Sequence, residues 1–147
     1  MRQFVCPSCG AANRIPDDRD AALARCGRCK AEVFSGAPLD VDAEGLARHL
    51  QGTRGAPVLV DVWAPWCGPC RAMAPQFAAA AARAGSGARL LKLNADENPG
   101  PCGQYGVQGI PALLLFDDGR LLARKAGLMS ADQILDWVTL ARAKAAV

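Results

Sequence analysis

The chain has 147 residues, of which 51% are hydrophobic and 21% are charged. This balance supports a buried core and excludes a disordered chain. The net charge of +3 is too small to indicate nucleic acid or a membrane surface as a partner. The length allows a small module followed by a domain of about 110 residues.

Seven cysteines are many for this length, and their placement is informative. Six form Cys-x-x-Cys pairs, and the seventh, Cys102, stands alone. No apolar stretch of a secretory signal follows Met1, and no apolar run approaches the roughly 18 residues of a membrane span. We therefore expect a cytoplasmic protein, in which paired cysteines are more often metal ligands or catalytic thiols than structural disulfides. The three pairs are Cys6/Cys9, Cys26/Cys29 and Cys67/Cys70.

Residues 1–36 are expected to form a small zinc-ribbon module of their own. The segment is polar and lacks periodic apolar runs, so it needs a metal or disulfides to fold. Ser35-Gly36-Ala37-Pro38 has the composition of a boundary, and residues 37–147 are expected to form the second domain.

Four of the cysteines in this module have the spacing C-x2-C-x16-C-x2-C, which is typical of zinc sites. Two tight turns would each present two sulfurs, and four thiolates close the shell around one structural Zn²⁺ per chain. Two local disulfides or four free thiols are the alternatives. Three roles are possible for the module: it could bind nucleic acid or protein, act as a scaffold, or hold a redox-sensitive metal site. The predicted ligands are Cys6, Cys9, Cys26 and Cys29.

The second domain alternates helical and strand patterns. Their order, α-β-α-β-β-β-α, predicts an α/β fold with one central sheet and helices on both faces. A helix is expected over 40–50, a buried strand over 58–63, a helix over 67–84 and a strand over 88–93. Two further strands, 112–116 and 121–125, are joined by a hairpin turn at 117–120, and a last helix runs from a Ser130 cap to about Lys144.

The start of the helix predicted over 67–84 carries the most specific chemistry. Unpaired N–H groups and partial positive charge at a helix N-terminus stabilise a thiolate. The spacing of Cys67 and Cys70 puts both sulfurs on one side of the first turn, and Pro69 is tolerated there. Cys67 is therefore predicted to be a nucleophile with a lowered pKa, and Cys70 the resolving thiol.

The run Trp66-Cys67-Gly68-Pro69-Cys70 resembles the active site of the thioredoxin family. With a zinc ribbon before this run, the chain is similar to the bacterial second-thioredoxin class. Two runs in the module also resemble that class: Asn13-Arg14-Ile15-Pro16 and Cys26-Gly27-Arg28-Cys29. The resemblance implies a thioredoxin fold with a central mixed sheet, and a protein-disulfide reductase without a bound organic cofactor. It also implies disulfide-containing protein substrates, an NADPH-dependent thioredoxin reductase as partner, and a monomer.

The same resemblance implies roles for residues around the thiols. Asp61 resembles the family's buried carboxylate. Burial should raise the pKa of this carboxyl group, so that it can accept the proton of Cys70. Lys92 resembles the family lysine that lies near this carboxylate. Gly109-Ile110-Pro111 resembles the cis-proline loop, whose backbone pairs with substrate. The substrate groove would comprise Trp66, Gly68, Pro69, Val107, Gly109, Ile110, Pro111, Ala126 and Gly127.

Simpler interpretations stay open for several of these residues. Asp61 could instead lie at a strand end and bond to the backbone. Lys92 could be a solvated surface cation, and Pro111 could be an ordinary trans proline. His49 is expected at the surface, and Cys102 is expected to be a small, partly buried residue.

Three other functions remain as rivals. A redox-controlled chaperone or zinc-based binding module is one, and a nucleic-acid-binding ribbon is another. A disulfide oxidant or isomerase is the third, although the Gly-Pro dipeptide between Cys67 and Cys70 opposes it.

Overall fold

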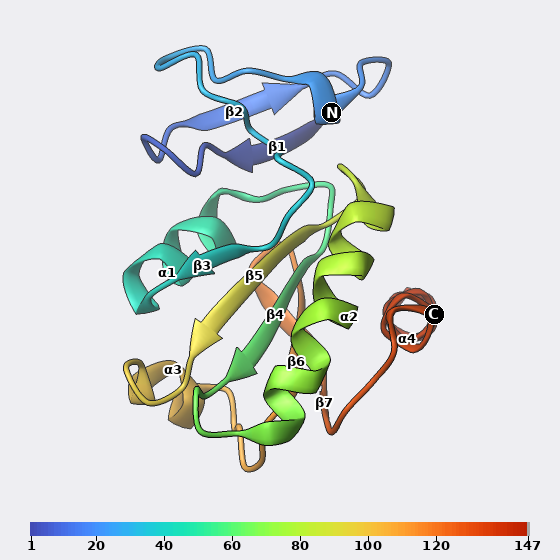
Figure 1. Cartoon of the computed structure of the whole chain (residues 1–147). Coiled ribbons are helices and arrows are strands. Elements are labelled where there is room, and N and C mark those ends of the chain that lie inside the picture. Colours follow the sequence, from blue (N-terminus) through green and yellow to red (C-terminus); the bar gives the residue numbers. More distant parts are fainter. Residues whose placement is uncertain (147) are drawn as a thin grey trace.

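The computed structural model describes residues 1–146, which form two sheets and the helices around the larger one (Figure 1). In chain order the elements are β1 (Arg2–Val5), β2 (Ala12–Ile15), the 3-10 turn η1 (Ala21–Leu23), β3 (Leu39–Val41), α1 (Ala43–Gly52), β4 (Val58–Trp63), α2 (Gly68–Ala84), β5 (Arg89–Asn94), α3 (Pro99–Gln104), β6 (Ala112–Asp117), β7 (Arg120–Ala126) and α4 (Ala131–Ala145).

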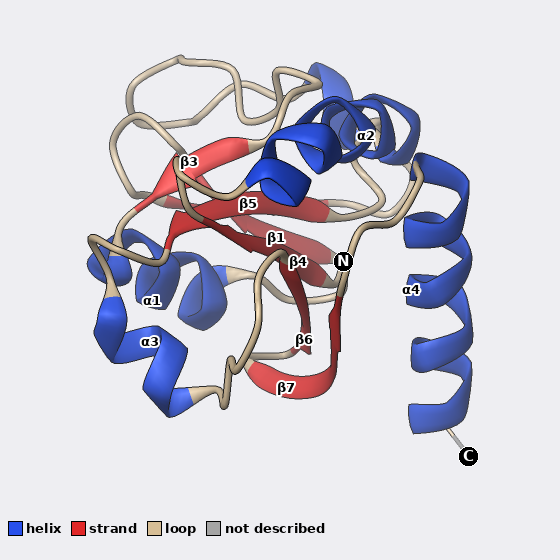
Figure 2. Cartoon of the chain, turned by 60° about the horizontal axis from the view of Figure 1, so that its bottom comes forward, coloured by secondary structure: helices blue, strands red, loops and turns tan. Residues whose placement is uncertain are grey.

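The larger sheet has five strands in the order β3-β5-β4-β6-β7. The first three are parallel, whereas β6 and β7 are antiparallel to their neighbours. Helices α2 and α4 cover one face, and α1 and α3 cover the other (Figure 2). The predicted mixed sheet with helices on both faces is confirmed.

Two apolar cores lie on the two sides of this sheet, because successive side chains of a strand point to opposite faces. On β4, Leu59 packs under α2 and α4, while Val58, Val60 and Val62 pack against α1. Asp61 follows the alternation of Leu59, so the strand directs it toward the face that α2 covers.

The hairpin between β6 and β7 forms where the sequence predicts it. Asp118 and Gly119 both have positive φ, 48° and 80°, which a two-residue type I′ turn requires. Asp117 pairs with Arg120 at the end of the ladder.

In the larger domain, two elements are missing from the predicted order, and one helix starts later than predicted. The expected helix over 40–50 begins at Ala43, after Asp42 caps it by accepting the N–H of Gly45. The residues before the cap form the edge strand β3. Helix α3 is absent from the predicted order, although a loop or short helix was expected around Cys102. Cys102 lies in α3 and is partly buried, as expected.

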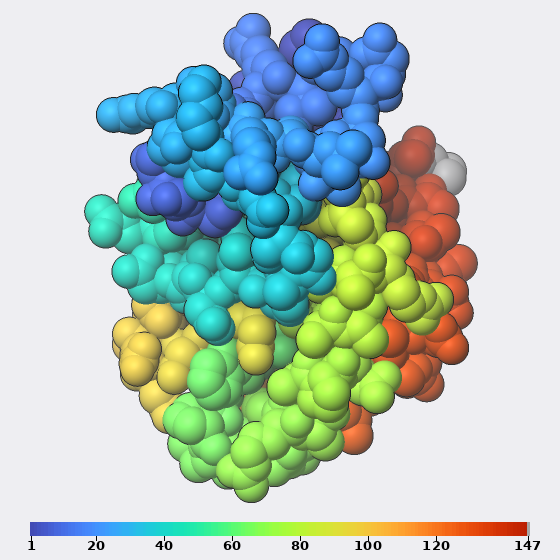
Figure 3. All heavy atoms as spheres, turned by 45° about the horizontal axis from the view of Figure 1, so that its top comes forward, coloured from blue at the N-terminus to red at the C-terminus, as the bar shows by residue number. Residues whose placement is uncertain are grey.

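The N-terminal module sits at the end of the sheet where β4 and β5 begin (Figures 1 and 3). Gln3 and Arg54 exchange backbone hydrogen bonds of 2.9 and 3.0 Å. Phe4, Ile15 and Val33 form a small core with Ala56, which lies just before β4. The module thus completes its core with a residue of the larger domain.

The prediction that His49 lies at the surface is wrong. This residue of α1 is only 4% exposed, because β1 packs against the C-terminal part of the helix. Burial, with the charges of Arg89 and Arg48, lowers the pKa of His49 to about 4. Among residues 1–146, no helix is long and apolar enough to cross a membrane.

Candidate functional site

The thiol pair lies at the N-terminus of α2, where β4 delivers the chain through a short turn. Cys67 is the N-cap residue, and its Sγ accepts the backbone N–H of Cys70 at 3.2 Å. The two cysteines form a disulfide with their Cα atoms 5.2 Å apart. Pro69 lies within the first turn, where its missing N–H removes no helix hydrogen bond. This arrangement directs helix N–H groups at one sulfur and keeps the second within bonding reach.

Most of the disulfide is buried, with Cys67 5% and Cys70 3% exposed. Trp63, Ala64 and Ile110 pack around it, whereas Gly68 and Pro69, between the two cysteines, are exposed. The disulfide is therefore largely shielded by its neighbours and lies next to an exposed turn.

The Ile110–Pro111 peptide bond is cis, as the sequence resemblance implies. The Ile110 carbonyl oxygen lies 3.9 Å from Cys67 Sγ. The Pro111 carbonyl accepts the N–H of Gly127 at 2.8 Å. These contacts bring residues 110–111 and 127 together beside Cys67.

Asp61 is 1% exposed and lies on β4, with Lys92 as its register partner on β5. Burial raises the pKa of Asp61 to about 6, and the positive charge of Lys92 opposes that rise. Among the residues described, Asp61 Oδ1 has no hydrogen-bond partner. The Lys92 ammonium lies 5.2 Å from the centre of the Trp63 ring. The carboxyl group can therefore exchange a proton near neutral pH.

Trp66 lies at the surface beside the thiols, 67% exposed. Its indole N–H donates to both carboxylate oxygens of Asp96, at 3.1 and 2.9 Å. Asp96 was not predicted, because the two residues are 30 positions apart and nothing in the local sequence links them.

Beyond the cis-proline loop lies a hollow of about 200 Å³. Predicted groove residues Val107, Gly109 and Ala126 line it together with Arg124 and Lys125. Leu128, which the sequence did not single out, is 54% exposed directly after Gly127. A larger cavity, about 790 Å³, opens elsewhere, beside β3, and the cysteines do not line it.

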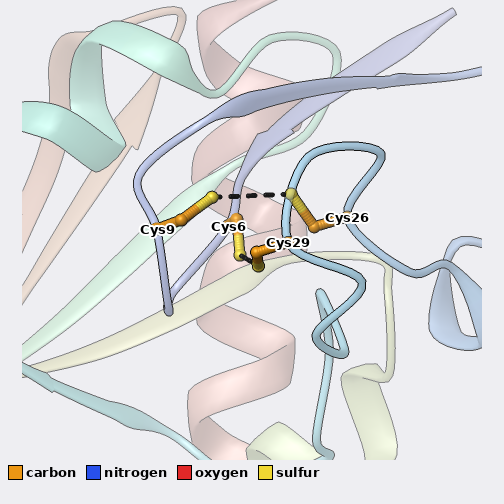
Figure 4. Close-up of side chains that lie close together, drawn as sticks. All are labelled: Cys6, Cys9, Cys26 and Cys29. Atoms are coloured by element: carbon orange, nitrogen blue, oxygen red, sulfur yellow. Dashed lines mark hydrogen bonds between the residues drawn. The ribbon is translucent and has the colours of Figure 1, made fainter.

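The four cysteines of the N-terminal module converge on one point (Figure 4). All four Sγ atoms lie within 4.8 Å of one another. The Sγ atoms of Cys6 and Cys29, and those of Cys9 and Cys26, are 3.6 Å apart. All four are free cysteines, so the predicted alternative of two local disulfides does not describe this structure.

The two turns that carry these cysteines are built alike. Ser8 N–H donates to Cys6 Sγ and Arg28 N–H donates to Cys26 Sγ, each at 3.4 Å. Asn13 ties β2 to the second turn, because its side chain donates to Cys26 Sγ at 3.4 Å and accepts the N–H of Gly27 at 2.9 Å. Hydrogen bonds from the Asn13 amide and from the backbone N–H groups of Cys29 and Arg28 lower the pKa of Cys26 to about 6.

The sulfur positions fit a tetrahedral metal ion. Zn–S bonds of about 2.3 Å in a tetrahedron put neighbouring sulfurs about 3.8 Å apart. Two of the observed separations are 3.6 Å, so little movement is needed to close the shell. Backbone N–H groups aimed at thiolate sulfurs are the outer support that such sites require.

Comparisons with known proteins agree with both sites. Residues 41–140 match the family model described as Thioredoxin, and residues 5–31 match the one described as Thioredoxin 2, N-terminal. "Thioredoxin C-3" of Corynebacterium nephridii is 32% identical over 135 residues, covering 92% of each chain. "Thioredoxin" of Rhodospirillum rubrum is 44% identical over 82 residues, 56% of this chain and 79% of its own.

A solved structure of a mutant thioredoxin from Halobacterium salinarum has a TM-score of 0.64 to this chain. It is 32% identical and covers 71% of this chain and 90% of its own. The fold and its paired thiols are those of a protein-disulfide reductase. The chain belongs to the thioredoxin family. Its N-terminal match agrees with the second-thioredoxin class that the sequence resembles.

Proposed function

We propose that this protein reduces disulfide bonds in other proteins, with Cys67 as the attacking thiol and Cys70 as the resolving thiol. The observation that carries the proposal is the position of Cys67 at the N-cap of α2. Its sulfur there accepts the N–H of the residue that bears the second sulfur, at 3.2 Å. A thiolate in that position is stabilised by the hydrogen bond and by the positive end of the helix.

The reaction consists of two thiol–disulfide exchanges. The Cys67 thiolate attacks one sulfur of a substrate disulfide, forms a mixed disulfide and releases the other substrate sulfur as a thiolate. Cys70, once deprotonated, attacks Cys67 Sγ and releases the second substrate thiolate. The substrate gains two electrons, and the protein ends with a Cys67–Cys70 disulfide.

Asp61 is proposed as the acceptor of the Cys70 proton, acting through water. Its pKa of about 6 leaves it mostly ionised at neutral pH and basic enough to take a proton in passing. Lys92 is proposed to favour the ionised form, and its opposing effect on that pKa supports this role.

The proposed substrate surface surrounds Cys67. An extended segment of the substrate would pair with the backbone of Gly109 and Ile110, a mode that uses main-chain groups and accepts many sequences. Apolar contact would come from exposed Trp66. Contact along the thiol turn and the cis-proline loop would come from Gly68, Pro69, Pro111 and Gly127.

Residues 1–36 are proposed as a zinc ribbon and residues 37–147 as the thioredoxin domain. Cys6, Cys9, Cys26 and Cys29 would hold one Zn²⁺, and bound zinc would supply folding free energy to a module with a small core. Four sulfur ligands leave no open position for substrate, which favours a structural ion. No organic cofactor is needed for the exchange reactions.

The oxidised pair must be reduced again after each turnover. An NADPH-dependent thioredoxin reductase is the proposed electron donor, and the protein is proposed to act as a cytoplasmic monomer. Both proposals rest on the family.

Replacement of the resolving thiol tests the assignment of the two cysteines. The Cys70→Ser protein should accumulate a mixed disulfide with a disulfide-bonded substrate such as insulin, because no second thiol attacks Cys67 Sγ to release the substrate. Mass spectrometry of the adduct identifies the bonded residue. The control is Cys102→Ser, which should reduce insulin at the wild-type rate. A Cys70→Ser protein that still turns over contradicts the assignment.

The rival functions give different results in simple assays. A binding or chaperone module would lose its main activity without residues 1–36 and keep it in Cys67→Ser. A nucleic-acid binder would show salt-dependent binding in a titration. An oxidant would have a reduction potential well above that of a reductant.

A further inference from the structure

Arg89 is a buried cation that the disulfide chemistry does not use. It is the first residue of β5 and is 3% exposed. Among residues 1–146, no carboxylate lies within ion-pair distance of its guanidinium. A buried charge without a partner is costly, so other groups around Arg89 must offset this cost.

The hydrogen bonds and aromatic-ring contacts found for its guanidinium are all with the N-terminal module. Arg89 Nη2 donates to the carbonyl oxygens of Val5 at 3.1 Å and Val33 at 2.9 Å. The guanidinium carbon lies 4.2 Å from the Phe34 ring centre and 5.7 Å from that of Phe4. One side chain of the larger domain therefore holds both ends of the module, near residues 5 and 33–34.

These neutral partners do not balance the charge. Carbonyl oxygens and aromatic faces stabilise a cation only in part, and Arg89 Nε has no hydrogen-bond partner among the residues described. Burial lowers the pKa of Arg89 to about 10, and the negative charge of Cys6 opposes this effect. Cys6 directly follows Val5, whose carbonyl Arg89 binds. One of the four clustered cysteines therefore adjoins a residue that Arg89 binds directly.

We propose that Arg89 is the buried counter-cation of the four-cysteine metal centre, and that it makes zinc binding and docking of the N-terminal module strengthen each other. The proposal rests on the zinc site of the proposed function. Four thiolates and one divalent ion carry a net charge of two minus, which a cation buried behind Cys6 stabilises better than water-screened surface charges do. Without the metal, repulsion between neighbouring thiolates keeps part of the cluster protonated, so Arg89 meets less negative charge there.

The coupling runs in both directions, because linkage between two binding events is reciprocal. If docking of the module tightens zinc binding by some factor, zinc must favour docking by the same factor. A change at Arg89 that removes this coupling is therefore expected to weaken zinc binding in the full chain. Loss of residues that support metal ligands from outside commonly weakens metal binding by about 10- to 100-fold.

Zinc affinity of the full chain tests the proposal, measured by competition with a chromophoric chelator. Arg89→Met is expected to bind zinc at least about tenfold more weakly. Arg89→Lys keeps the charge and is expected to stay within about threefold of the wild type, although it lacks the planar fork. Arg25→Met removes an exposed cation next to Cys26 and is expected to change affinity less than about twofold, because water screens it.

Hydrogen exchange gives a second readout that does not depend on activity. Zinc should protect the β1–β2 amides of the wild type strongly and those of Arg89→Met weakly. Equal zinc affinity of Arg89→Met and wild type overturns the proposal. A tenfold loss of zinc affinity in Arg89→Lys also overturns the proposal. The lysine variant therefore tests the proposal even if Arg89→Met does not fold. A wild-type protein that binds no zinc contradicts the zinc site itself, and the role of Arg89 falls with it.

Discussion

Asp61 shows how a single residue combines a structural cost with a chemical use. It lies in the apolar strand β4 with 1% exposure, and burial raises its pKa from 3.8 to about 6. The folded state therefore binds more protons than the unfolded state between about pH 4 and pH 6. Stability falls as the pH rises through this window, and the full penalty is present above it.

Asp61→Asn is accordingly expected to stabilise the oxidised protein at pH 7. A shift of about two pKa units corresponds to about 3 kcal/mol in the free energy of unfolding. The gain should shrink toward zero near pH 4, where aspartic acid is neutral in both states. Urea unfolding from pH 4 to pH 8 measures this difference. Asp136→Asn, at an exposed position of α4, is the control, and equal behaviour of the two variants would contradict the account.

The sequence predicted the residues whose signal is local. The Cys-x-x-Cys spacings, the aspartate inside an apolar strand and the Ile-Pro pair are readable from neighbours along the chain. Asp96, Asn13 and Arg89 were not predicted, because their partners lie 30, 13 and 56 or more positions away. Such contacts exist only once the elements are packed.

Among the elements, α1 connects the two parts of the protein. Its last residue, Gly52, faces Val5 of β1 so closely that an added Cβ would overlap the valine side chain. Val5 is itself buried, with 2% of its surface exposed. The absence of a side chain at position 52 is what allows the module to dock on this helix.

Gly52→Ala is therefore expected to lower the free energy of unfolding by about 1–3 kcal/mol, since it overpacks a filled interface. Gly103→Ala in α3 is the matched control, because a Cβ there meets open space. Alanine favours a helix by up to about 1 kcal/mol over glycine, so the control should be neutral or more stable. Thermal unfolding of both variants makes the comparison, and equal losses would contradict the packing argument.

Two elements of the larger domain, β3 and α3, are missing from the predicted order because their local sequences carry weak signals. Strand β3 has three residues and runs directly into the cap of α1, too short for an alternation pattern. Helix α3, Pro99–Gln104, contains two glycines and two prolines, which are poor helix formers. Packing of Cys102 and Tyr105 against the core under α1 outweighs that preference.

At the scale of the whole molecule, the two cysteine sites lie at opposite ends of the central sheet. The thiol pair follows the end of β4, whereas the four-cysteine cluster belongs to the module near the start of β4 and β5 (Figure 1). The module covers His49 and shares a core with Ala56. Its loss would therefore expose apolar surface of the larger domain.

Removal of zinc with a strong chelator is expected to lower Tm by about 5 °C or more, because ligand binding to the folded state stabilises it. Hydrogen exchange in residues 1–36 should rise at the same time. Restoring Zn²⁺ should reverse both changes, whereas Mg²⁺, which prefers oxygen ligands, should not. An unchanged Tm after complete zinc removal would show that the metal does not support the fold.

The thiolate at the start of α2 is the basis of the proposed chemistry, and alkylation of the reduced, zinc-loaded protein at pH 6 tests it most directly. Peptide mass spectrometry follows Cys67 while N-acetylcysteine in the same solution serves as an ordinary thiol. Cys67 should react at least about tenfold faster, because the helix N-terminus and the Cys70 N–H favour its thiolate. A rate no greater than that of N-acetylcysteine would contradict the assignment of Cys67 as nucleophile.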